Sequence, residues 1–251
     1  MLTRRIIPCL DVQDGQTVKG VHFVNLRRVG DPVTLGQFYA RQGADELVYL
    51  DITATVENRR AWVEMVQRVA QKINIPFTVG GGIRTIGDVE KMLQAGADKV
   101  SVNSAAVQEP ALVNRMAREF GSQCIVIAID ARQEGGEWWV YTHGGRQRTF
   151  WRAIDWAREV TERGAGEILL TSMNHDGTRN GFALDITRQL AEMLPIPVIA
   201  SGGAGRMEHF LKVFREGKAD AALAASVFHF GHFTIPQLKQ FLKMNGIEVR
   251  L

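Results

Sequence analysis

The sequence predicts an α/β fold, a (β/α)8 barrel of the TIM type, and three observations lead to it. The chain has 251 residues, and such barrels run to about 250 residues as one domain. Eight short apolar runs alternate with amphipathic stretches, a pattern that indicates βαβ units and a parallel sheet. Three sequence patterns recur in the same order 121 or 122 residues later. An open doubly wound sheet is the alternative, although eight even units leave little room for a sheet edge.

Strands are predicted where short apolar, β-branched runs occur. In chain order these runs are residues 4–12, 46–52, 76–81, 99–104, 124–130, 167–172, 197–203 and 221–227. Helices are predicted where apolar residues recur at helical spacing. These stretches are residues 59–73, 85–95, 111–120, 151–163 and 207–216. Several helices are predicted to end at a glycine, as is typical of helix ends: Gly43, Gly96, Gly121, Gly164 and Gly217.

The internal repeat divides the predicted barrel into two similar half-barrels of four units each. Residues 1–251 form one domain, with half-barrels at approximately 1–122 and 123–251. The repeated segments are 43–47 and 164–168, 75–82 and 196–203, and 97–104 and 219–226. Three separate matches in order are poorly explained by coincidence.

Composition excludes several classes of protein. Apolar residues make up 45% and charged residues 23%, which is typical of a globular chain and not of a disordered, collagenous or coiled-coil one. No apolar run approaches the roughly 18 residues of a membrane helix, and residues 1–8 lack a secretory apolar region, so we expect a cytoplasmic protein without a membrane partner. The net charge of +3 suits an anionic small substrate, and no Lys/Arg run indicates a nucleic-acid partner. Cys9 and Cys124 form no CxxC motif, so reduced thiols are expected.

Two aspartates are candidate catalytic residues. In this fold the active site lies at the carboxyl ends of the strands. Asp11 ends the first predicted strand and Asp130 ends the fifth, so they face each other across an eight-stranded ring. Such a pair can act as general acid and base. Each alone could equally cap the loop or helix that follows, but their symmetric placement favours catalysis.

Duplicated glycine turns predict two phosphate sites. Residues 80–82 follow the third strand and 202–203 follow the seventh, while Ser104 and Ser226 end the fourth and eighth. Glycine lets the backbone approach a ligand, and free N–H groups at a helix start attract phosphate. We therefore expect a substrate with a phosphate at each end. Lys19, in a loop after the first strand, could reach a phosphate from a mobile lid, although solvated loop lysines are common.

No metal site is predicted. His175 lies in a turn after the sixth strand, where Asp176-Gly177 alone is a turn signal. A metal or acid–base role for His175 is the less favoured reading. The other histidines considered show no ligand spacing with carboxylates or cysteines: His143, His209, His229 and His232.

Charged residues are predicted inside the opposite end of the barrel. Side chains alternate along a strand, so an inward Asp11 brings Arg5 inward as well. By the same count Glu46, Lys99 and Glu167 lie at one level with it. Two cations and two anions would form either a structural salt-bridge layer or a polar constriction that admits something small.

Together, a set of motifs spanning nearly the whole chain closely resembles the cyclase subunit family of imidazole glycerol phosphate synthase, from histidine biosynthesis. The motifs are residues 7–12, 18–20, 50–54, 79–84, 97–101, 164–171, 200–205 and 221–229. The resemblance implies a lyase. Ammonia from a partner glutaminase, docked on the amino-terminal face of the barrel, would convert a ribulosyl aminoimidazole carboxamide nucleotide with two phosphates. The products would be imidazole glycerol phosphate and aminoimidazole carboxamide ribotide.

The resemblance also implies roles for particular residues. Asp11 and Asp130 match the family's general acid/base residues, and Asp98 matches a glutaminase-facing position. Arg5, Glu46, Lys99 and Glu167 match its ammonia gate. Substrate-lining positions are matched by Lys19, Gly82, Asn103, Ser104, Thr171, Asp176, Gly177, Gly203, Ala224 and Ser226. The family's reaction uses no cofactor and no metal.

The chain departs from the commonest family pattern in two places. Where many relatives read Met-Asp-Arg-Asp-Gly, this chain has Asn174 and His175 before Asp176, so we expect chemistry with an altered rate. Aromatic Phe150 and Trp151 stand where smaller residues are usual, in a segment that is a flexible lid in the family.

Two other functions stay open at this point. One is the related isomerase of the preceding step, which would use the same two aspartates without ammonia. The other is a barrel that binds bisphosphates or docks a partner without catalysis. The start of the first strand, residues 8–11, and the ring of four charges favour the cyclase over the isomerase.

Overall fold

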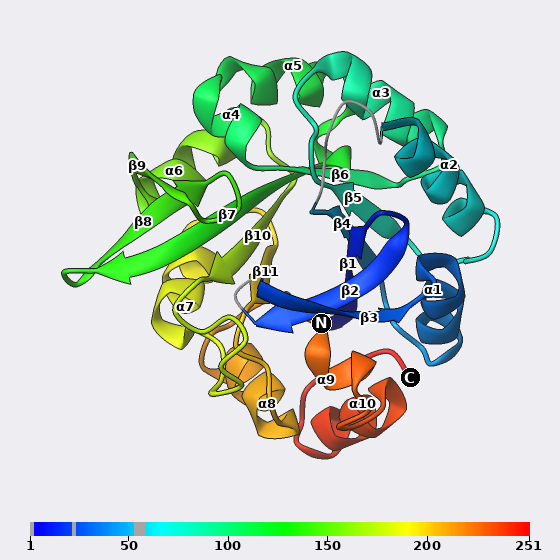
Figure 1. Cartoon of the computed structure of the whole chain (residues 1–251). Coiled ribbons are helices and arrows are strands. Elements are labelled where there is room, and N and C mark those ends of the chain that lie inside the picture. The colour runs from blue at the N-terminus through cyan, green and yellow to red at the C-terminus, as the bar shows by residue number, and fades with distance from the viewer. Residues whose placement is uncertain (1–2, 22–23, 53–58) are drawn as a thin grey trace.

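Eight parallel strands close into a barrel at the centre of the molecule, and helices surround it (Figure 1). The computed structural model describes residues 3–21, 24–52 and 59–251, without the side chains of 19–21, 24–27 and 59. In ring order the strands are β1 (Arg5–Gln13), β4 (Leu47–Asp51), β5 (Phe77–Gly80), β6 (Lys99–Val102), β7 (Ile125–Glu134), β10 (Glu167–Ser172), β11 (Val198–Ser201) and β12 (Ala221–Ala224). The ring closes because β12 pairs in parallel with β1. The predicted (β/α)8 barrel is confirmed.

Helices connect consecutive strands and pack on the outside of the barrel. They are α1 (Pro32–Arg41), α2 (Arg59–Ala70), α3 (Ile86–Gln94), α5 (Ala111–Phe120), α6 (Ala153–Glu162), α7 (Leu184–Met193), α8 (Met207–Arg215) and α10 (Ile235–Met244), with short α4 (Ser104–Gln108), α9 (Ser226–His229) and the 3-10 turn η1 (Ser122–Cys124). Capping explains several starts: Asp31 accepts the N–H of Thr34 ahead of α1, and Thr85 forms a capping box with Asp88 ahead of α3. Of these helices, α7, α10 and the short α4, α9 and η1 were not predicted from the sequence, and for α1 only its end at Gly43 was predicted.

Several predicted strand ends are wrong: β7 continues past residue 130 to Glu134, β11 ends at Ser201 and not at residue 203, and two further predicted strands run into helices. Residues 99–104 and 221–227 were each predicted as one strand, but β6 ends at Val102 and β12 at Ala224. Ser104 and Ser226 instead begin the short helices α4 and α9. Apolar runs cannot show where a strand loses its ladder partner, so their last residues were assigned to the strand.

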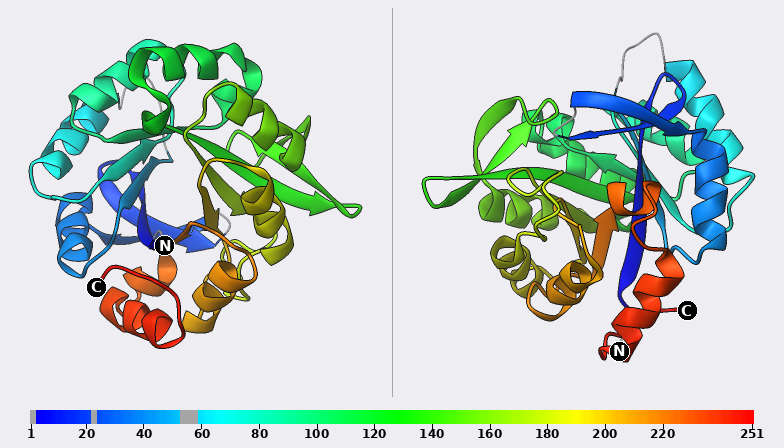
Figure 2. Two further views of the ribbon diagram at one scale, coloured as in Figure 1. Left: turned by 180° about the vertical axis from the view of Figure 1, so that it is seen from behind. Right: turned by 60° about the horizontal axis from the view of Figure 1, so that its bottom comes forward.

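Two antiparallel extensions rise from the carboxyl end of the barrel. The segment after β1, predicted as a lid loop, is strand β2 (Gln16–Val21), which pairs with β1 and with β3 (Val24–Gly30). After β7, the chain forms β8 (Glu137–Thr142) and β9 (Gln147–Arg152), so residues 151 and 152 are in a strand and not in the predicted helix. Two-residue turns with positive φ at both positions, 14–15 and 135–136, begin the two extensions. Figure 2 shows the β2–β3 ribbon at the end of the barrel opposite the N-terminus.

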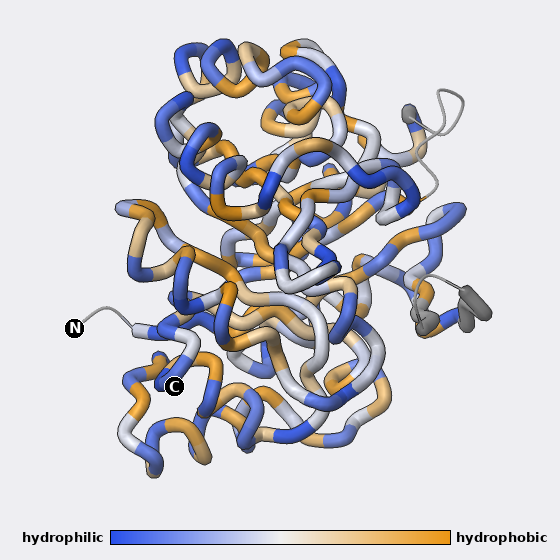
Figure 3. Tube along the Cα trace, turned by 90° about the vertical axis from the view of Figure 1, so that its left-hand side faces the viewer, coloured by the Kyte–Doolittle hydropathy of each residue, from blue (hydrophilic) through white to orange (hydrophobic). Residues whose placement is uncertain are grey.

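The buried apolar residues form two cores. A large outer core lies between the strands and the helices, and it includes fully buried Leu10 and Trp156. A smaller inner core fills the barrel: Ile7, Cys9, Val48, Val126, Leu169, Ile199, Ala221, Leu223 and Ala225. The alternation of inner-core and outer-core residues along β1 confirms that Ile7 and Cys9 share the inward face. Figure 3 shows hydrophobic residues running through the interior and polar ones along the outer turns of the helices.

Repeated aspartates fix where three strands begin. Asp45 Oδ2 accepts the backbone N–H of Ile6 at 2.8 Å. Asp98 and Asp220 do the same for Phe77 and Val198, at 2.9 and 3.0 Å. Each carboxylate therefore ties the start of its own strand to the preceding strand in the ring. This is the physical reason for the repeated Ala-Asp pairs in the sequence.

Candidate active site

A cavity of about 1520 Å³ opens at the carboxyl ends of the barrel strands. All but one of the residues predicted for catalysis or substrate binding line it: Asp11, Gly82, Asn103, Ser104, Asp130, Thr171, Asp176, Gly177, Gly203, Ala224 and Ser226. The remaining residue, Lys19, lies in β2, and its side chain is outside the described part of the chain. Segments from both halves of the sequence thus meet around one cavity.

The two candidate catalytic carboxylates come from strands on opposite sides of the ring. Asp11 is buried near the end of β1, and its Oδ1 lies 3.8 Å from the thiol Sγ of Cys9. Asp130 lies in β7, where its Oδ2 accepts a hydrogen bond from Asn103 Nδ2 at 3.0 Å. The same Asn103 amide also donates to the carbonyl of Tyr141 at 3.3 Å, so the first strand of the hairpin extension orients it.

The surroundings of Asp130 adjust its proton affinity. Burial and the negative charge of Asp176 raise the pKa of Asp130 to about 6, while the hydrogen bond from Asn103 opposes that rise. A carboxyl group with a pKa near the working pH can both accept and donate a proton. Perturbed carboxyls in a cleft are typical of acid–base sites.

Glycine turns bring the backbone close to the cavity at two equivalent places. Gly81 has a φ of 93°, and a Cβ there would lie 2.1 Å from the carbonyl oxygen of Asp51. Gly202 has a φ of 91°, and a Cβ there would lie 2.7 Å from the carbonyl oxygen of Ser172. A side chain at either position would strain the backbone and clash with it.

Short helices start beside both glycine turns. Among the described residues, neither flanking side chain, Asn103 for α4 or Ala225 for α9, caps the first turn. No flanking side chain therefore competes with a ligand for the N–H groups of the first turn, although the N–H of Phe228 in α9 donates to the carbonyl of Ala225 at 3.1 Å. Ser104 Oγ also accepts the backbone N–H of His143 at 3.0 Å, which joins the turn between β8 and β9 to this side of the cavity.

Several cavity residues were not predicted from the sequence. Asp51 ends β4, and the strand-end rule that selected Asp11 would have found it. Arg84, Arg146 and Arg179 are exposed at the rim, and no spacing in the sequence marks loop arginines that converge only in space.

His175 does not line the cavity. Its Nδ1 lies 2.8 Å from Ser172 Oγ, and burial lowers its pKa, with Asp185 opposing the shift. Within the described residues, no group of three or more His, Cys, Asp or Glu side chains is arranged to hold a metal ion.

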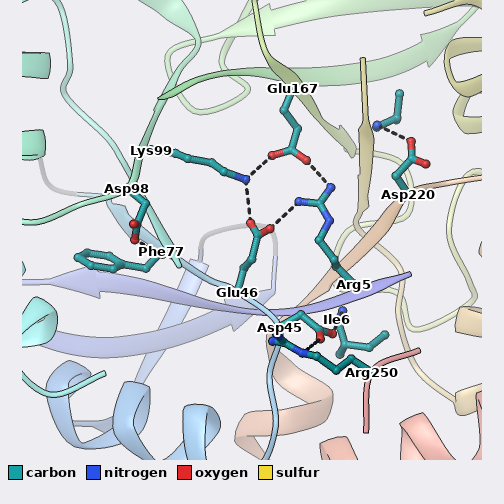
Figure 4. Close-up of polar contacts among 11 residues, drawn as sticks. Arg5, Ile6, Asp45, Glu46, Phe77, Asp98, Lys99, Glu167, Asp220 and Arg250 are labelled. Carbon is teal, nitrogen blue, oxygen red and sulfur yellow. Dashed lines mark hydrogen bonds and ion pairs between the residues drawn. The ribbon is translucent and has the colours of Figure 1, made fainter. Parts of the chain in front are cut away.

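At the opposite end of the barrel, the four predicted charges form a closed ring (Figure 4). Arg5 contacts Glu46 at 2.6 Å and also Glu167, and Lys99 contacts Glu46 at 3.1 Å and Glu167 at 3.0 Å. Burial lowers the pKa of Arg5, but the two glutamates outweigh it and hold that pKa above its ordinary value. Each cation bridges both anions, so the ring closes this end of the barrel interior.

Asp98 lies beside the ring on the amino-terminal face. The side chain is exposed, although one carboxylate oxygen accepts the N–H of Phe77 (Figure 4). On the other side of the ring (Figure 4), Asp220 forms an ion pair with Arg4 at 2.8 Å.

A closed (β/α)8 barrel with carboxylates and glycine turns around a cavity at its carboxyl end has the architecture of an α/β-barrel enzyme. The family model described as histidine biosynthesis protein matches residues 5–234. Curated relatives named imidazole glycerol phosphate synthase subunit HisF are 62% identical in Phocaeicola vulgatus and 61% in Flavobacterium johnsoniae, over 251 residues and the full length of both chains. The relative of that name from Geobacillus kaustophilus is 58% identical over 252 residues, again covering both chains fully.

The chain belongs to the histidine biosynthesis protein family, and within it to the cyclase subunits of imidazole glycerol phosphate synthase. The resemblance indicated by the sequence motifs is confirmed, and with it the prediction of an enzyme, a lyase of histidine biosynthesis. No helix in residues 3–21, 24–52 and 59–251 combines the length and the apolar character needed to cross a membrane.

Proposed function

We propose that the chain uses ammonia to convert the bisphosphate ribulosyl aminoimidazole carboxamide nucleotide into imidazole glycerol phosphate and aminoimidazole carboxamide ribotide. The observation that carries this proposal is the cavity itself. It places Asp11 and Asp130 between two glycine turns that each adjoin a short helix starting at serine. A substrate with a phosphate at each end would span the mouth of the barrel, with its middle beside the carboxylates.

The two phosphates bind at equivalent places in the two half-barrels. One site comprises Gly82, Asn103 and Ser104, and the other comprises Gly203, Ala224 and Ser226. The first-turn N–H groups of α4 and α9 donate to the phosphate oxygens. Asp176, Gly177 and Thr171 line the side between Asp130 and the second phosphate, and Lys19 supplies a cation from β2.

Asp11 and Asp130 exchange protons with the substrate. Ammonia adds to the ketone carbon, and loss of water gives an imine that can rearrange to an enamine. The bond to the aminoimidazole carboxamide nitrogen then breaks, and ring closure completes the imidazole. Each proton transfer needs a group that can hold and release a proton, which the raised pKa of Asp130 permits. Neither a metal nor a cofactor takes part.

Ammonia enters from the other end of the barrel. A glutaminase partner docks on the amino-terminal face near Asp98, as its exposed position beside the ring permits. The ring of Arg5, Glu46, Lys99 and Glu167 then acts as the gate. Because every cation in it bridges both anions, passage requires at least one of these contacts to open. The complex works in the cytoplasm.

An ammonium-fed assay tests the proposed reaction. The purified chain is mixed with the bisphosphate substrate and an ammonium salt at alkaline pH, and the loss of substrate absorbance is followed. We expect ammonium-dependent consumption that yields imidazole glycerol phosphate. Tight binding without consumption would contradict catalysis and indicate a binding scaffold. Turnover of the isomerase substrate of the preceding step, without ammonium, would instead indicate the related isomerase.

A further inference from the structure

The loop that follows β10 is fastened to the outer part of β7 by one side chain. Asn174 Oδ1 accepts the backbone N–H of Gln133 at 2.8 Å, and Asn174 Nδ2 donates to the carbonyl of Gln133 at 3.4 Å. One carboxamide thus satisfies both polar groups of one peptide residue. Asn174 is also one of the positions at which this chain departs from the commonest family pattern.

The Asn174 side chain continues the hydrogen bonding between β10 and β7 beyond the point where the backbone pairing ends. In the barrel, Ser172 pairs with Ala131, and the N–H of Met173 still donates to the carbonyl of Ala131 at 2.9 Å. The next bond of a parallel ladder would run from Gln133 N–H to a backbone carbonyl of the loop. The loop has already turned away there, and the Asn174 side chain supplies that acceptor instead.

The backbone N–H and carbonyl of Gln133 need hydrogen-bond partners on the edge of β7 that faces away from β8. Beyond the barrel, β7 pairs with β8 across a two-residue turn, with Glu134 opposite Glu137 and Gln133 opposite Trp138. In such a hairpin the residues flanking the turn exchange hydrogen bonds, so the polar groups of Gln133 face the other edge. The Asn174 carboxamide, which both donates and accepts, supplies the hydrogen bonds at this edge of β7.

The fastened loop carries a group of the proposed active site. Two residues after Asn174, Asp176 lines the cavity, and its N–H donates to the carbonyl of Ser172 at 2.9 Å. Asp130, on the same strand as Gln133, is the carboxyl that Asp176 influences. The hydrogen bonds between Asn174 and Gln133 therefore join the loop that carries Asp176 to the strand that carries Asp130. The spacing of these two segments sets the distance between the two carboxyls.

We propose that Asn174 is a positioning residue of the enzyme, which holds the loop bearing Asp176 in register with the strand bearing Asp130. This inference rests on the proposed function, because it assigns Asn174 a part in the same reaction. A carboxylate at this position would keep the acceptor for Gln133 N–H but lose the donor. An alanine would lose both.

The test compares Asn174→Ala and Asn174→Asp with Asn180→Ala, a control at an exposed residue of the same loop. Ammonium-dependent kcat/KM is measured well below the unfolding temperature, together with hydrogen exchange at the Gln133 amide in the intact chain. We expect Asn174→Ala to lower kcat/KM by about tenfold, less than the roughly 10²-fold cost of a 1 Å misplacement. Exchange at Gln133 should rise by about tenfold as its hydrogen bond is lost.

The order of the variants separates a positioning role from a purely structural one. We expect wild type and Asn180→Ala to be most active, Asn174→Asp intermediate and Asn174→Ala least active. Activity of Asn174→Ala within twofold of wild type, or an equal loss in Asn180→Ala, would overturn the proposal. Should Asn174→Ala fail to fold, an Asn174→Asp variant as active as wild type would overturn it as well. A wild-type chain that does not consume substrate with ammonium would contradict the proposed function itself.

Discussion

The two ends of the barrel hold the same kind of group in opposite electrical surroundings. At the amino end, Glu46 and Glu167 point inward and share two cations, with four contacts among four residues. At the carboxyl end, Asp130 lines the cavity, accepts a hydrogen bond from a neutral amide, and lies within the electrostatic influence of a second carboxylate, Asp176. One end has balanced charge and the other has an excess of negative charge.

This difference shows which surroundings suit a buried carboxyl to proton transfer and which suit it to a structural role. A carboxylate that is paired with cations is stabilised as an anion and is suited to a closed, structural or gating layer. A carboxyl that is desolvated beside another negative charge binds its proton near neutral pH and is suited to proton transfer. The same strand geometry builds both, and the neighbouring side chains decide the outcome.

The largest effect should come from removing the carboxyls at the carboxyl end. Asp11→Asn and Asp130→Asn should each lower ammonium-dependent turnover by about 10² or more, because the reaction loses a proton-transfer group. Steady-state kinetics measure the loss, and circular dichroism checks that the fold persists. If both folded variants kept near-full activity, the acid/base assignment would be wrong.

The fold and the site could be predicted from the sequence to different degrees. The strands that carry Asp11 and Asp130 were found because apolar runs and an internal repeat are periodic signals. The helices α7 and α10 were missed, and only the end of α1 was predicted, although the Asp31-Pro32 pair ahead of α1 is a helix-start signal. The β8–β9 hairpin was also missed, although Trp138, Val140 and Tyr141 of β8 are buried.

At the site, residues fixed by strand position could be predicted and those fixed by loop contacts could not. The positions of the strand ends predicted that Asp130 and the glycine turns lie around one site. The alternation of side chains along a strand predicted the ring of charges that contains Arg5. The contact of Asn174 with Gln133 joins residues that are 41 apart in sequence through a side chain acting as backbone. No periodic pattern encodes such a contact.

Removing the charge of Asp130 should also stabilise the protein at neutral and alkaline pH. Its folded pKa of about 6 lies above the unfolded value of about 3.9, so the folded state is penalised wherever Asp130 is ionised. The penalty is fully present above pH 6 and fades as pH falls toward 4. Asp130→Asn should therefore raise the free energy of unfolding by about 2–3 kcal/mol at pH 8 and show no such gain at pH 4.

Denaturant unfolding at the two pH values measures this change. Asp155→Asn, at an exposed aspartate of α6, is the control for removal of a carboxyl charge. A gain for Asp130→Asn of the same size at pH 4 and pH 8 would show that burial of its charge is not the cause.

A smaller and more selective effect should come from opening the ring at the amino end. Lys99→Ala leaves Glu46 and Glu167 with Arg5 as their remaining ring cation, which should cost about 1–2 kcal/mol, less than for a fully buried pair. Glutamine-dependent turnover with the glutaminase should fall several-fold more than turnover fed with ammonium. Parallel assays of Lys99→Ala and the exposed-site control Lys91→Ala measure the ratio. Equal loss in both assays would leave the ring a structural layer.

The smallest effect is expected from metal removal. Because proton transfer by Asp11 and Asp130 accounts for the proposed chemistry, dialysis against a chelator should leave ammonium-dependent turnover unchanged within error. Turnover is measured before and after dialysis, with and without added Mg²⁺ or Zn²⁺. A loss that one of these ions restores would contradict a reaction carried by carboxyls alone.

The most direct test of the contrast between the two ends is a carbon-13 NMR titration of the Asp130 carboxyl, with Asp130→Asn identifying its signal. The structure predicts a midpoint near pH 6 in the wild type, because burial and the charge of Asp176 both favour the protonated form. In Asp176→Asn the midpoint should move toward the ordinary value of about 3.9. A wild-type midpoint near 4 that is insensitive to Asp176 would contradict the claim that these surroundings prepare Asp130 for proton transfer.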